Sequence, residues 1–349
     1  MDKVFYVTAV RESDWDSGAE MSLYLPATPY ELLDGLDQLR LPWGAPALAW
    51  VEGTCRFDAL SKILTEPCDL CALNALARRL STLTEAECTA FEGLLALEVQ
   101  QSGCDMDLRR LLDLASNTDC CHVIGGILND SQLGRFYGES GFVPGVETLP
   151  DHVFELLDFE RIGRERRQAE GGVFTPGGYV LRHGPPVRRV PEPSWGDPPE
   201  YILRWEDGKC VDCCIPRLTG LITEARDSPV IACLGEKLSA MNAHERVAYK
   251  ALLETFNCRD LRQAAELADT INNYLFSPEI SSPVEMAKDV LTYTLTEPER
   301  LTPYLNLYQY GQALIDETNG VLTPYGLLER RDGQPVLAAE APKSGMTMR

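Results

Sequence analysis

The chain is poor in basic residues and histidine, and it has no long apolar run. Its 349 residues include 32 Lys and Arg against 53 Asp and Glu, for a formal net charge of −21. This shortage of cations argues against direct binding of nucleic acid or of an anionic membrane, and it favours basic partners. No apolar segment reaches the roughly 18 residues that a membrane-spanning helix needs. We therefore expect a soluble protein that does not enter membranes.

The common catalytic and cofactor-binding motifs are missing as well. The four histidines lie outside HExxH and nucleophile-elbow patterns, and no Walker A or GxGxxG loop occurs. The first residues do not form a secretory signal, so a cytoplasmic location is expected. Twelve cysteines in such a chain are typical of free thiols in a reducing compartment. The sequence predicts a protein that is not an enzyme and binds neither a metal nor another cofactor.

What the sequence does contain is a long internal repeat. Residues 55–95 align with residues 213–253 without a gap, and residues 157–182 align with residues 305–330. The second alignment pairs Gly163 with Gly311. A repeat of this length indicates a duplicated module and not a short solenoid unit. We expect the two copies to share one topology from their helical middle to their last strand.

The repeat sets the expected domain organisation. Residues 1–182 form copy one, and residues 200–331 form a second copy that is shortened at its start. Residues 183–199 are rich in Pro and Arg and are typical of a linker. Residues 332–349 are expected to be a flexible tail.

Hydrophobic periodicity and capping signals predict an α+β fold for each module. Short strands are expected at 4–10, 21–25 and 47–51, with a helix opened by Thr28 and Glu31 as a capping box. Further helices are expected at 58–64, 70–80, 85–100, 108–116, 131–137 and from about 153 to 171. A strand over 173–181 closes the copy. Each elongated module thus combines a small antiparallel sheet, a helical middle and a helix-plus-strand end.

Two Cys-x-x-Cys pairs are candidate ligands for a zinc ion. Cys68 and Cys71 lie far from Cys210 and Cys213 in the chain, and the pairs occupy non-equivalent positions of the repeat. This spacing favours free thiols, with a zinc site as the alternative. Tyr304, Tyr308 and Tyr310 could form a stacking surface, but their helical spacing predicts that they pack.

Acidic residues concentrate in the first copy. Residues 1–180 contain 29 acidic and 14 basic residues, against 24 and 18 in residues 181–349. Like charges three or four residues apart destabilise a helix slightly, so acidic stripes indicate either a solvated face or a function. On a single helix, Asp151, Glu155, Asp158 and Glu165 would share one face. The candidate partner-binding carboxylates are Asp14, Asp16, Glu20, Glu31, Asp34, Asp37, Asp151, Glu155, Asp158, Glu160 and Glu165.

The second copy serves as an internal comparison for these carboxylates. Asn306 stands where copy one has Asp158, and Tyr308 and Ala313 replace Glu160 and Glu165. The module therefore does not require these acids for folding. A row of carboxylates can imitate the phosphates of a DNA duplex, which carry one charge per roughly 1.7 Å of axis. Such a row would compete for the basic channel of a DNA-binding enzyme.

Two segments carry a resemblance to a known family. The run from Leu156 to Glu165, followed by Gly171-Gly172-Val173-Phe174, resembles the C-terminal signature of ArdA antirestriction proteins. The opening strand, Leu23-Tyr24-Leu25-Pro26 and the Glu31 helix are similar to that family's start. The resemblance covers roughly residues 1–182. It implies an elongated, dimeric α+β protein of mobile genetic elements that mimics bent DNA and occupies the DNA site of type I restriction-modification enzymes.

The chain departs from the family pattern in being doubled and in carrying an arginine cluster in the signature helix. Two hypotheses follow. The first is a DNA-mimic inhibitor of a host defence enzyme, either a restriction-modification complex or a CRISPR effector. The second is an interaction or assembly protein of a mobile element that uses the fold without mimicry. A homodimer is compatible with both, and the role of the second copy stays open.

Overall fold

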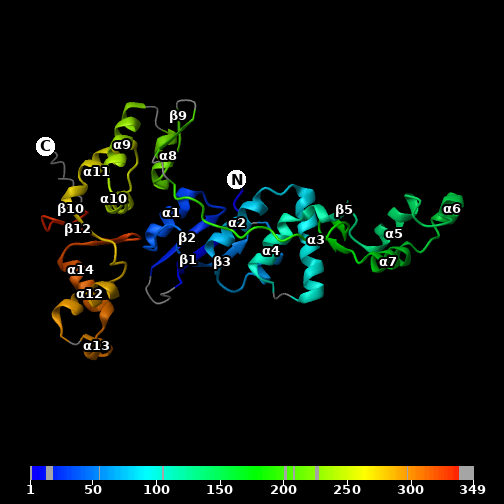
Figure 1. The fold of residues 1–349 in the computed structure, drawn as a ribbon, viewed down its shortest axis with the longest axis horizontal. Coiled ribbons are helices and arrows are strands. Elements are labelled where there is room, and N and C mark those ends of the chain that lie inside the picture. Colours follow the sequence, from blue (N-terminus) through cyan, green and yellow to red (C-terminus); the bar gives the residue numbers. More distant parts are fainter. Residues whose placement is uncertain are drawn as a thin grey trace, which may run out of the picture. The chain divides into compact units, whose positions relative to one another are not determined.

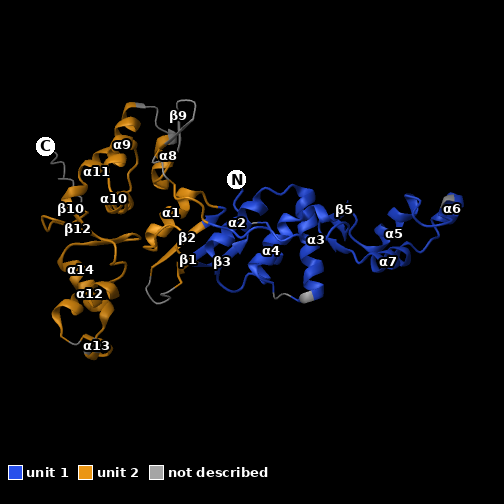
Figure 2. Ribbon diagram, viewed as in Figure 1, with its two compact units in different colours: residues 1–8, 24–26, 48–194 blue, residues 9–23, 27–47, 195–349 orange. Residues whose placement is uncertain are grey.

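The structure is a computed structural model that describes residues 2–12, 19–54, 56–103, 106–199, 203–206, 209–224, 228–296 and 298–337. It is a mixed α+β protein in which helices predominate and the strands form small sheets (Figure 1). The chain divides into two compact units (Figure 2). Unit 1 comprises residues 1–8, 24–26 and 48–194, and unit 2 comprises residues 9–23, 27–47 and 195–349.

The first half of the chain, up to the end of β7, contains seven α-helices, three 3-10 helices and seven strands within its described residues. In chain order they are β1 (Phe5–Arg11), β2 (Glu20–Leu25), α1 (Pro29–Gln38), β3 (Ala47–Thr54), η1 (Asp58–Lys62), β4 (Cys68–Asp69), α2 (Leu70–Ser81), α3 (Glu85–Ser102), α4 (Leu108–Ser116), η2 (Thr118–Cys120), β5 (Cys121–Gly125), α5 (Asp130–Glu139), η3 (Val146–Thr148), α6 (Asp151–Phe154), α7 (Phe159–Glu170), β6 (Val173–Thr175) and β7 (Gly178–Arg182). One sheet has the strand order β2-β1-β3-β4, and another the order β5-β7-β6.

The second half begins with a hairpin and continues with a similar helical series. Its described elements are β8 (Leu203–Glu206), β9 (Lys209–Cys213), α8 (Pro216–Glu224), α9 (Ser228–Ala240), α10 (Ala243–Phe256), α11 (Leu261–Asp269), η4 (Ile271–Asn273), β10 (Tyr274–Ser277), α12 (Pro283–Thr294), α13 (Pro298–Leu301), η5 (Thr302–Tyr304), α14 (Leu307–Glu317), β11 (Val321–Thr323) and β12 (Gly326–Arg330). The last sheet has the order β10-β12-β11.

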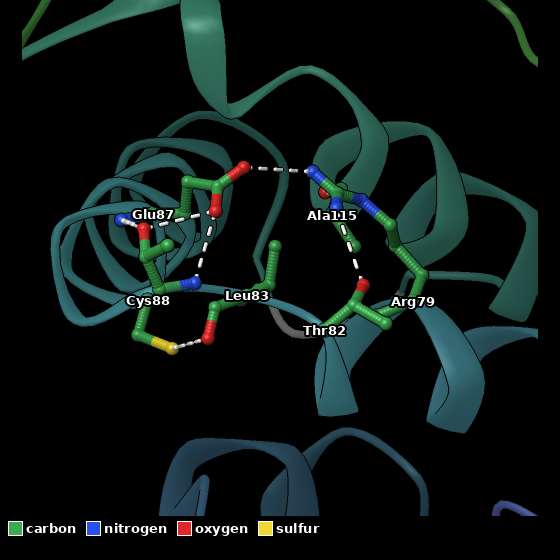
Figure 3. A network of polar contacts seen from close by, with 7 residues as sticks. Arg79, Thr82, Leu83, Glu87, Cys88 and Ala115 are labelled. Carbon is green, nitrogen blue, oxygen red and sulfur yellow. Dashed lines mark hydrogen bonds and ion pairs between the residues drawn. The ribbon is translucent and has the colours of Figure 1, made fainter. Parts of the chain in front are cut away.

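Capping residues explain where several helices begin. Thr28 and Glu31 form the capping box of α1 as the sequence predicts, and Thr84 with Glu87 does the same for α3. Glu87 also binds Arg79 of α2 at 3.2 Å, and the Arg79 Nε donates to the Ala115 carbonyl of α4 at 2.9 Å (Figure 3). The hydrogen bonds from Thr84 hold the pKa of Glu87 below its usual value. One arginine thus joins three helices of unit 1.

Three expected elements differ from the structure. The segment predicted as a helix at 58–64 is the short 3-10 helix η1. The single helix expected from about residue 153 is two helices, α6 and α7, because Asp158 caps the start of α7 and separates them. The strand expected over 173–181 is the hairpin of β6 and β7, since Gly178 turns the chain at a φ of +151° that other residues rarely adopt.

The two segments that align in sequence have the same order of strands and the same register. Cys121 pairs with Arg182 between β5 and β7, and Tyr274 pairs with Arg330, the residue aligned with Arg182, between β10 and β12. Gly326 turns the second hairpin at a φ of +142°, as Gly178 does the first. The hydroxyl groups of Thr175 and Thr323 donate to the carbonyls of these two glycines.

Aligned glycines also occupy the same close helix crossing in each segment. An added Cβ at Gly163 of α7 would lie 1.8 Å from the Asp130 carbonyl oxygen of α5. At Gly311 of α14 it would lie 1.6 Å from the Pro283 carbonyl oxygen of α12. Backbones this close leave no space for a side chain, so both positions require glycine. The alignment of Gly163 with Gly311 therefore has a direct steric reason.

The division into units differs from the expected domain boundaries. Residues 27–47, placed in copy one by the sequence, belong to unit 2, where Tyr30 lies in a core with Ile215 and Leu218. The first part of the expected linker is held on unit 1. The Asn117 side chain binds the backbone N–H and carbonyl of Arg188 at 3.0 and 2.9 Å, and Asp113 accepts from the Val190 N–H at 2.9 Å.

Candidate partner-binding surfaces

The carboxylates of residues 151–165, here called the acidic segment, lie on the surface of unit 1. Asp151 opens α6, and Glu155 ends it. Glu160 and Glu165 lie on α7. The side chains of Glu155, Glu160 and Glu165 are 56%, 64% and 63% exposed. Because α6 and α7 are separate helices, the expected stripe along one continuous helix is wrong, although its residues are exposed.

Arginines accompany most of these acids. Arg135 of α5 binds Glu155 at 2.5 Å and Glu139 at 2.8 Å. Arg161 binds Glu165 at 2.9 Å, and Arg164 binds Glu160. Such exposed ion pairs contribute little to stability and are screened by salt, so the carboxylates stay available to a competing cation. The pairs nevertheless reduce the negative field of the acidic segment.

The net charge of this region does not distinguish the two halves of the chain. Residues 130–170, from α5 to α7, contain nine acidic and five basic side chains, and residues 283–318, from α12 to the C-cap of α14, contain six and two. The excess of acids is therefore the same. What differs is position, since Tyr308 and Ala313 replace the exposed carboxylates of Glu160 and Glu165.

Asp158 has a structural role that the sequence comparison did not show. Its Oδ1 accepts from the Arg161 N–H at 3.0 Å and caps α7. The aligned Asn306 caps α14 in the same way, with its Oδ1 3.1 Å from the Gln309 nitrogen. The two aligned positions thus share the cap, and only Asp158 carries a charge.

This comparison gives a first prediction. Asp158→Asn is expected to leave the stability of unit 1 nearly unchanged, because Asn is as good an N-cap as Asp. Asp158→Ala should lower the free energy of unfolding by about 1 kcal/mol, since the backbone N–H at the third helical position loses its acceptor. Urea unfolding of the two variants beside the parent measures the difference. Equal losses in both variants would show that the charge of Asp158, and not its cap, stabilises α7.

The N-terminal carboxylates lie in several different environments. Asp14 and Asp16 are outside the described residues. Glu20 is exposed at the start of β2. Glu31 accepts from the Thr28 N–H at 2.7 Å and completes the capping box of α1.

Asp34 and Asp37 are not on an exposed face, and the expectation that they continue an exposed row of acids is wrong. Their side chains are only 16% and 22% exposed. Both bind Lys250 of α10, whose Nζ lies 2.8 Å from Asp34 and 2.7 Å from Asp37. The Tyr325 hydroxyl also donates to Asp34 at 3.1 Å. These acids join α1 to the rest of unit 2.

Burial sets the protonation behaviour of this Lys250 cluster, formed by Asp34, Asp37, Lys250 and Tyr325. Burial raises the pKa of Asp37, and the charge of Lys250 offsets this only in part. For Lys250, burial alone would lower the pKa, but the two carboxylates outweigh it and raise the pKa above its usual value. Lys250 is 4% exposed, so the cluster is largely desolvated.

The sequence contained one signal for this cluster. Lys250 stands in an otherwise apolar run, Val247-Ala248-Tyr249-Lys250-Ala251-Leu252-Leu253, and a lysine in such a run needs a buried partner. The partners could not be found from sequence because they lie more than 200 residues away in α1.

The expectation that Tyr304 and Tyr308 pack is wrong. Tyr304 is 85% exposed and Tyr308 60% exposed, and Tyr293 of α12 is 83% exposed. The aligned position of Tyr304 in copy one is Leu156, which is 82% exposed. Large apolar side chains on the surface are typical of protein contacts. Tyr304, with Tyr308 and Tyr293, is therefore a second candidate surface.

Cysteines give no sign of a metal centre in the described residues. Cys68 and Cys71 are free thiols, and burial raises the pKa of both, that of Cys71 to about 11. Among the side chains that the structure places, no group of three His, Cys, Asp or Glu residues could hold a metal ion. None of the described helices combines the length and apolarity that crossing a membrane requires.

Comparisons with known proteins add no family assignment. No protein-family model matches the chain, and no curated protein matches its sequence.

Proposed function

We propose that this chain is a non-catalytic DNA mimic that inhibits a host enzyme acting on nucleic acid, namely a type I restriction-modification complex. The proposal rests on the exposed carboxylates of the acidic segment. Apart from Asp158, their side chains neither cap a helix nor take part in a buried ion pair. It is supported by the net charge of −21 and by the resemblance to ArdA antirestriction proteins. The acids would occupy the basic channel in which the enzyme binds DNA.

The structure changes which acids can serve this purpose. Asp34 and Asp37 are bound by Lys250, and Glu31 and Asp158 cap helices. The mimic surface that we propose is therefore Asp151, Glu155, Glu160 and Glu165. Arg135, Arg161 and Arg164 would have to release their carboxylates when a basic channel approaches. Breaking these ion pairs requires little free energy, because exposed ion pairs are only weakly stable in water.

We also infer that the two segments are copies of one duplicated module. The shared register of their sheets, the glycines at both helix crossings and the paired N-caps support this inference. Unit 2 differs from unit 1 in having α1 packed into its core, so the two copies need not have the same role. We propose that the acidic segment of copy one binds the target enzyme.

Salt dependence tests the mimicry. The concentration of the chain that half-inhibits a type I restriction-modification enzyme should rise at least about tenfold between about 50 and about 200 mM NaCl, because competition for a DNA channel is electrostatic. Excess unmodified duplex should relieve inhibition competitively. Inhibition that is insensitive to both salt and duplex would reject mimicry. A CRISPR effector assayed in parallel identifies the class of target.

The exposed tyrosines favour a second candidate function. Tyr293, Tyr304 and Tyr308 belong to α12, η5 and the first turn of α14, and aromatic side chains of this kind are enriched in protein interfaces. An interaction or assembly protein of a mobile element would use them without imitating DNA. Binding of that kind should survive high salt and be lost in Tyr304→Ser/Tyr308→Ser.

A further inference from the structure

Unit 1 contains a cavity whose border includes η1, the element that aligns with α8 of unit 2, on which α1 packs. The cavity has a volume of about 580 Å³ and is bordered by η1, α3 and the turn between β6 and β7. Phe57, Ile63, Leu95, Phe174 and Pro176 are among its apolar lining residues. Glu92 of α3 is the acid on its helical wall.

The alignment of the two copies identifies the equivalent place in unit 2. Phe57 aligns with Ile215, Leu95 with Leu253 and Pro176 with Pro324. Ile215 and Leu253 belong to the core that includes Tyr30 of α1, and α1 packs on α8, which aligns with η1. Two lining residues of the cavity, Phe57 and Leu95, thus have counterparts in the core of unit 2 that includes Tyr30 of α1.

One charged residue of the cavity has an aligned counterpart of opposite charge in unit 2. Glu92 aligns with Lys250, the residue that binds Asp34 and Asp37 of α1. Gly177 aligns with Tyr325, whose hydroxyl donates to Asp34. In unit 2 a lysine therefore selects a helix with two acids. In unit 1 the same position offers a carboxylate, and the neighbouring turn lacks the tyrosine side chain.

Glu92 is held in a setting that favours a cation. Burial raises its pKa, and Asp58 raises it further, whereas Arg56 lowers it. Arg56 is itself exposed, and its guanidinium lies over the Phe57 ring at 5.8 Å from the centroid. Lys62 is exposed at the cavity's border. A cation that entered beside Glu92 would offset the desolvation of this carboxylate.

We propose that the cavity of unit 1 is a docking site for an amphipathic helix of a protein partner. The helix carries a large apolar anchor where α1 has Tyr30, and Lys or Arg where α1 has Asp34 and Asp37. A second copy of α1 is disfavoured because its two acids would meet Glu92. This inference rests on the proposed duplication. It is independent of the proposed mimicry, since it uses α3 and the β6–β7 turn and not the acidic segment.

Two peptides and the full chain test the proposal. The first peptide spans residues 27–40, so it keeps Tyr30 and the Thr28–Glu31 capping box; the second carries Asp34→Lys and Asp37→Lys. Each is labelled, and its binding to the full chain is followed by fluorescence anisotropy. The Lys peptide should bind at least about tenfold more tightly than the native peptide.

Substitutions in the cavity provide the controls. Glu92→Lys should reverse the preference of the chain for the two peptides, and Glu92→Gln should abolish it. Ala96→Phe, which places a neutral ring in the cavity, should abolish binding of both. Circular dichroism verifies that each variant is folded. The proposal is overturned if the parent binds neither peptide, if it prefers the native peptide, or if Glu92→Lys leaves the preference unchanged.

Discussion

Lys250→Met is expected to lower the free energy of unfolding of unit 2 by about 3–5 kcal/mol, because it leaves two largely buried carboxylates without their cation. Lys250 is 4% exposed and lies within 2.8 Å of both Asp34 and Asp37. Methionine keeps the length and apolar stem of the side chain, so the loss reports the charge and not a cavity. Urea unfolding at neutral pH, followed by far-UV circular dichroism, measures it.

The pH dependence of this loss has a definite sign. Burial raises the folded-state pKa of Asp37, so its contribution to stability falls as pH rises from about 4, where the unfolded group ionises. Without Lys250 that pKa rises further. The variant should therefore recover stability as the pH is lowered from 7 toward 4, and the gap to the parent should narrow. In the parent, the pKa of Lys250 is raised, so its contribution is complete below about pH 10 and is lost as the pH rises through the higher folded-state value.

Removing the acids as well as the cation provides the control. Asp34→Asn and Asp37→Asn in the Lys250→Met background leave no unpaired charge, and much of the lost stability should return. Tyr325 can still donate to the amide oxygen at position 34. If the triple variant is as unstable as Lys250→Met alone, the loss comes from packing and the assignment of the Lys250 cluster is wrong.

Local signals in the sequence were sufficient for much of the fold. Thr28 with Glu31 and Thr84 with Glu87 place the starts of α1 and α3 because a capping box involves residues only three positions apart. Here the sequence needed no knowledge of distant contacts. The two three-stranded sheets were not predicted, because the sequence indicated one strand over 173–181 and none at β5 or β10.

The sequence does not reveal a residue's role where that role depends on a distant or alternative partner. On a helical wheel, Asp158 joined an acidic stripe, but Asp also caps helices, and capping divides the expected helix into α6 and α7. Asp34 and Asp37 have the spacing of a solvated face, yet their partner Lys250 comes from another part of the chain. The spacing of acidic residues in the sequence predicts which helix face they share, but it does not predict which cation they bind.

The acidic segment leads to the largest expected functional effect. The quadruple variant Asp151→Asn, Glu155→Gln, Glu160→Gln and Glu165→Gln should inhibit a type I restriction-modification enzyme on the order of 100-fold more weakly than the parent. Each amide keeps the shape of the side chain and removes one charge, and Asp158 is retained so that α7 keeps its cap. Inhibition should weaken more than the change in net charge alone predicts. Arg161 and Arg164 lose their acidic partners in this variant, and their charges then repel the basic channel.

A variant with the same change in net charge elsewhere separates position from total charge. Glu236→Gln, Glu266→Gln, Asp316→Asn and Glu317→Gln alter exposed acids of unit 2 and leave the acidic segment intact. This control should inhibit within a few-fold of the parent, whereas the quadruple variant of unit 1 should not. Restriction of unmodified phage in cells with matched expression provides the same comparison in vivo. Equal weakening of both variants would mean that net charge alone drives binding. Full protection by the unit 1 variant would exclude the acidic segment and favour the exposed tyrosines, because an apolar contact at Tyr304 and Tyr308 does not depend on carboxylates on α7.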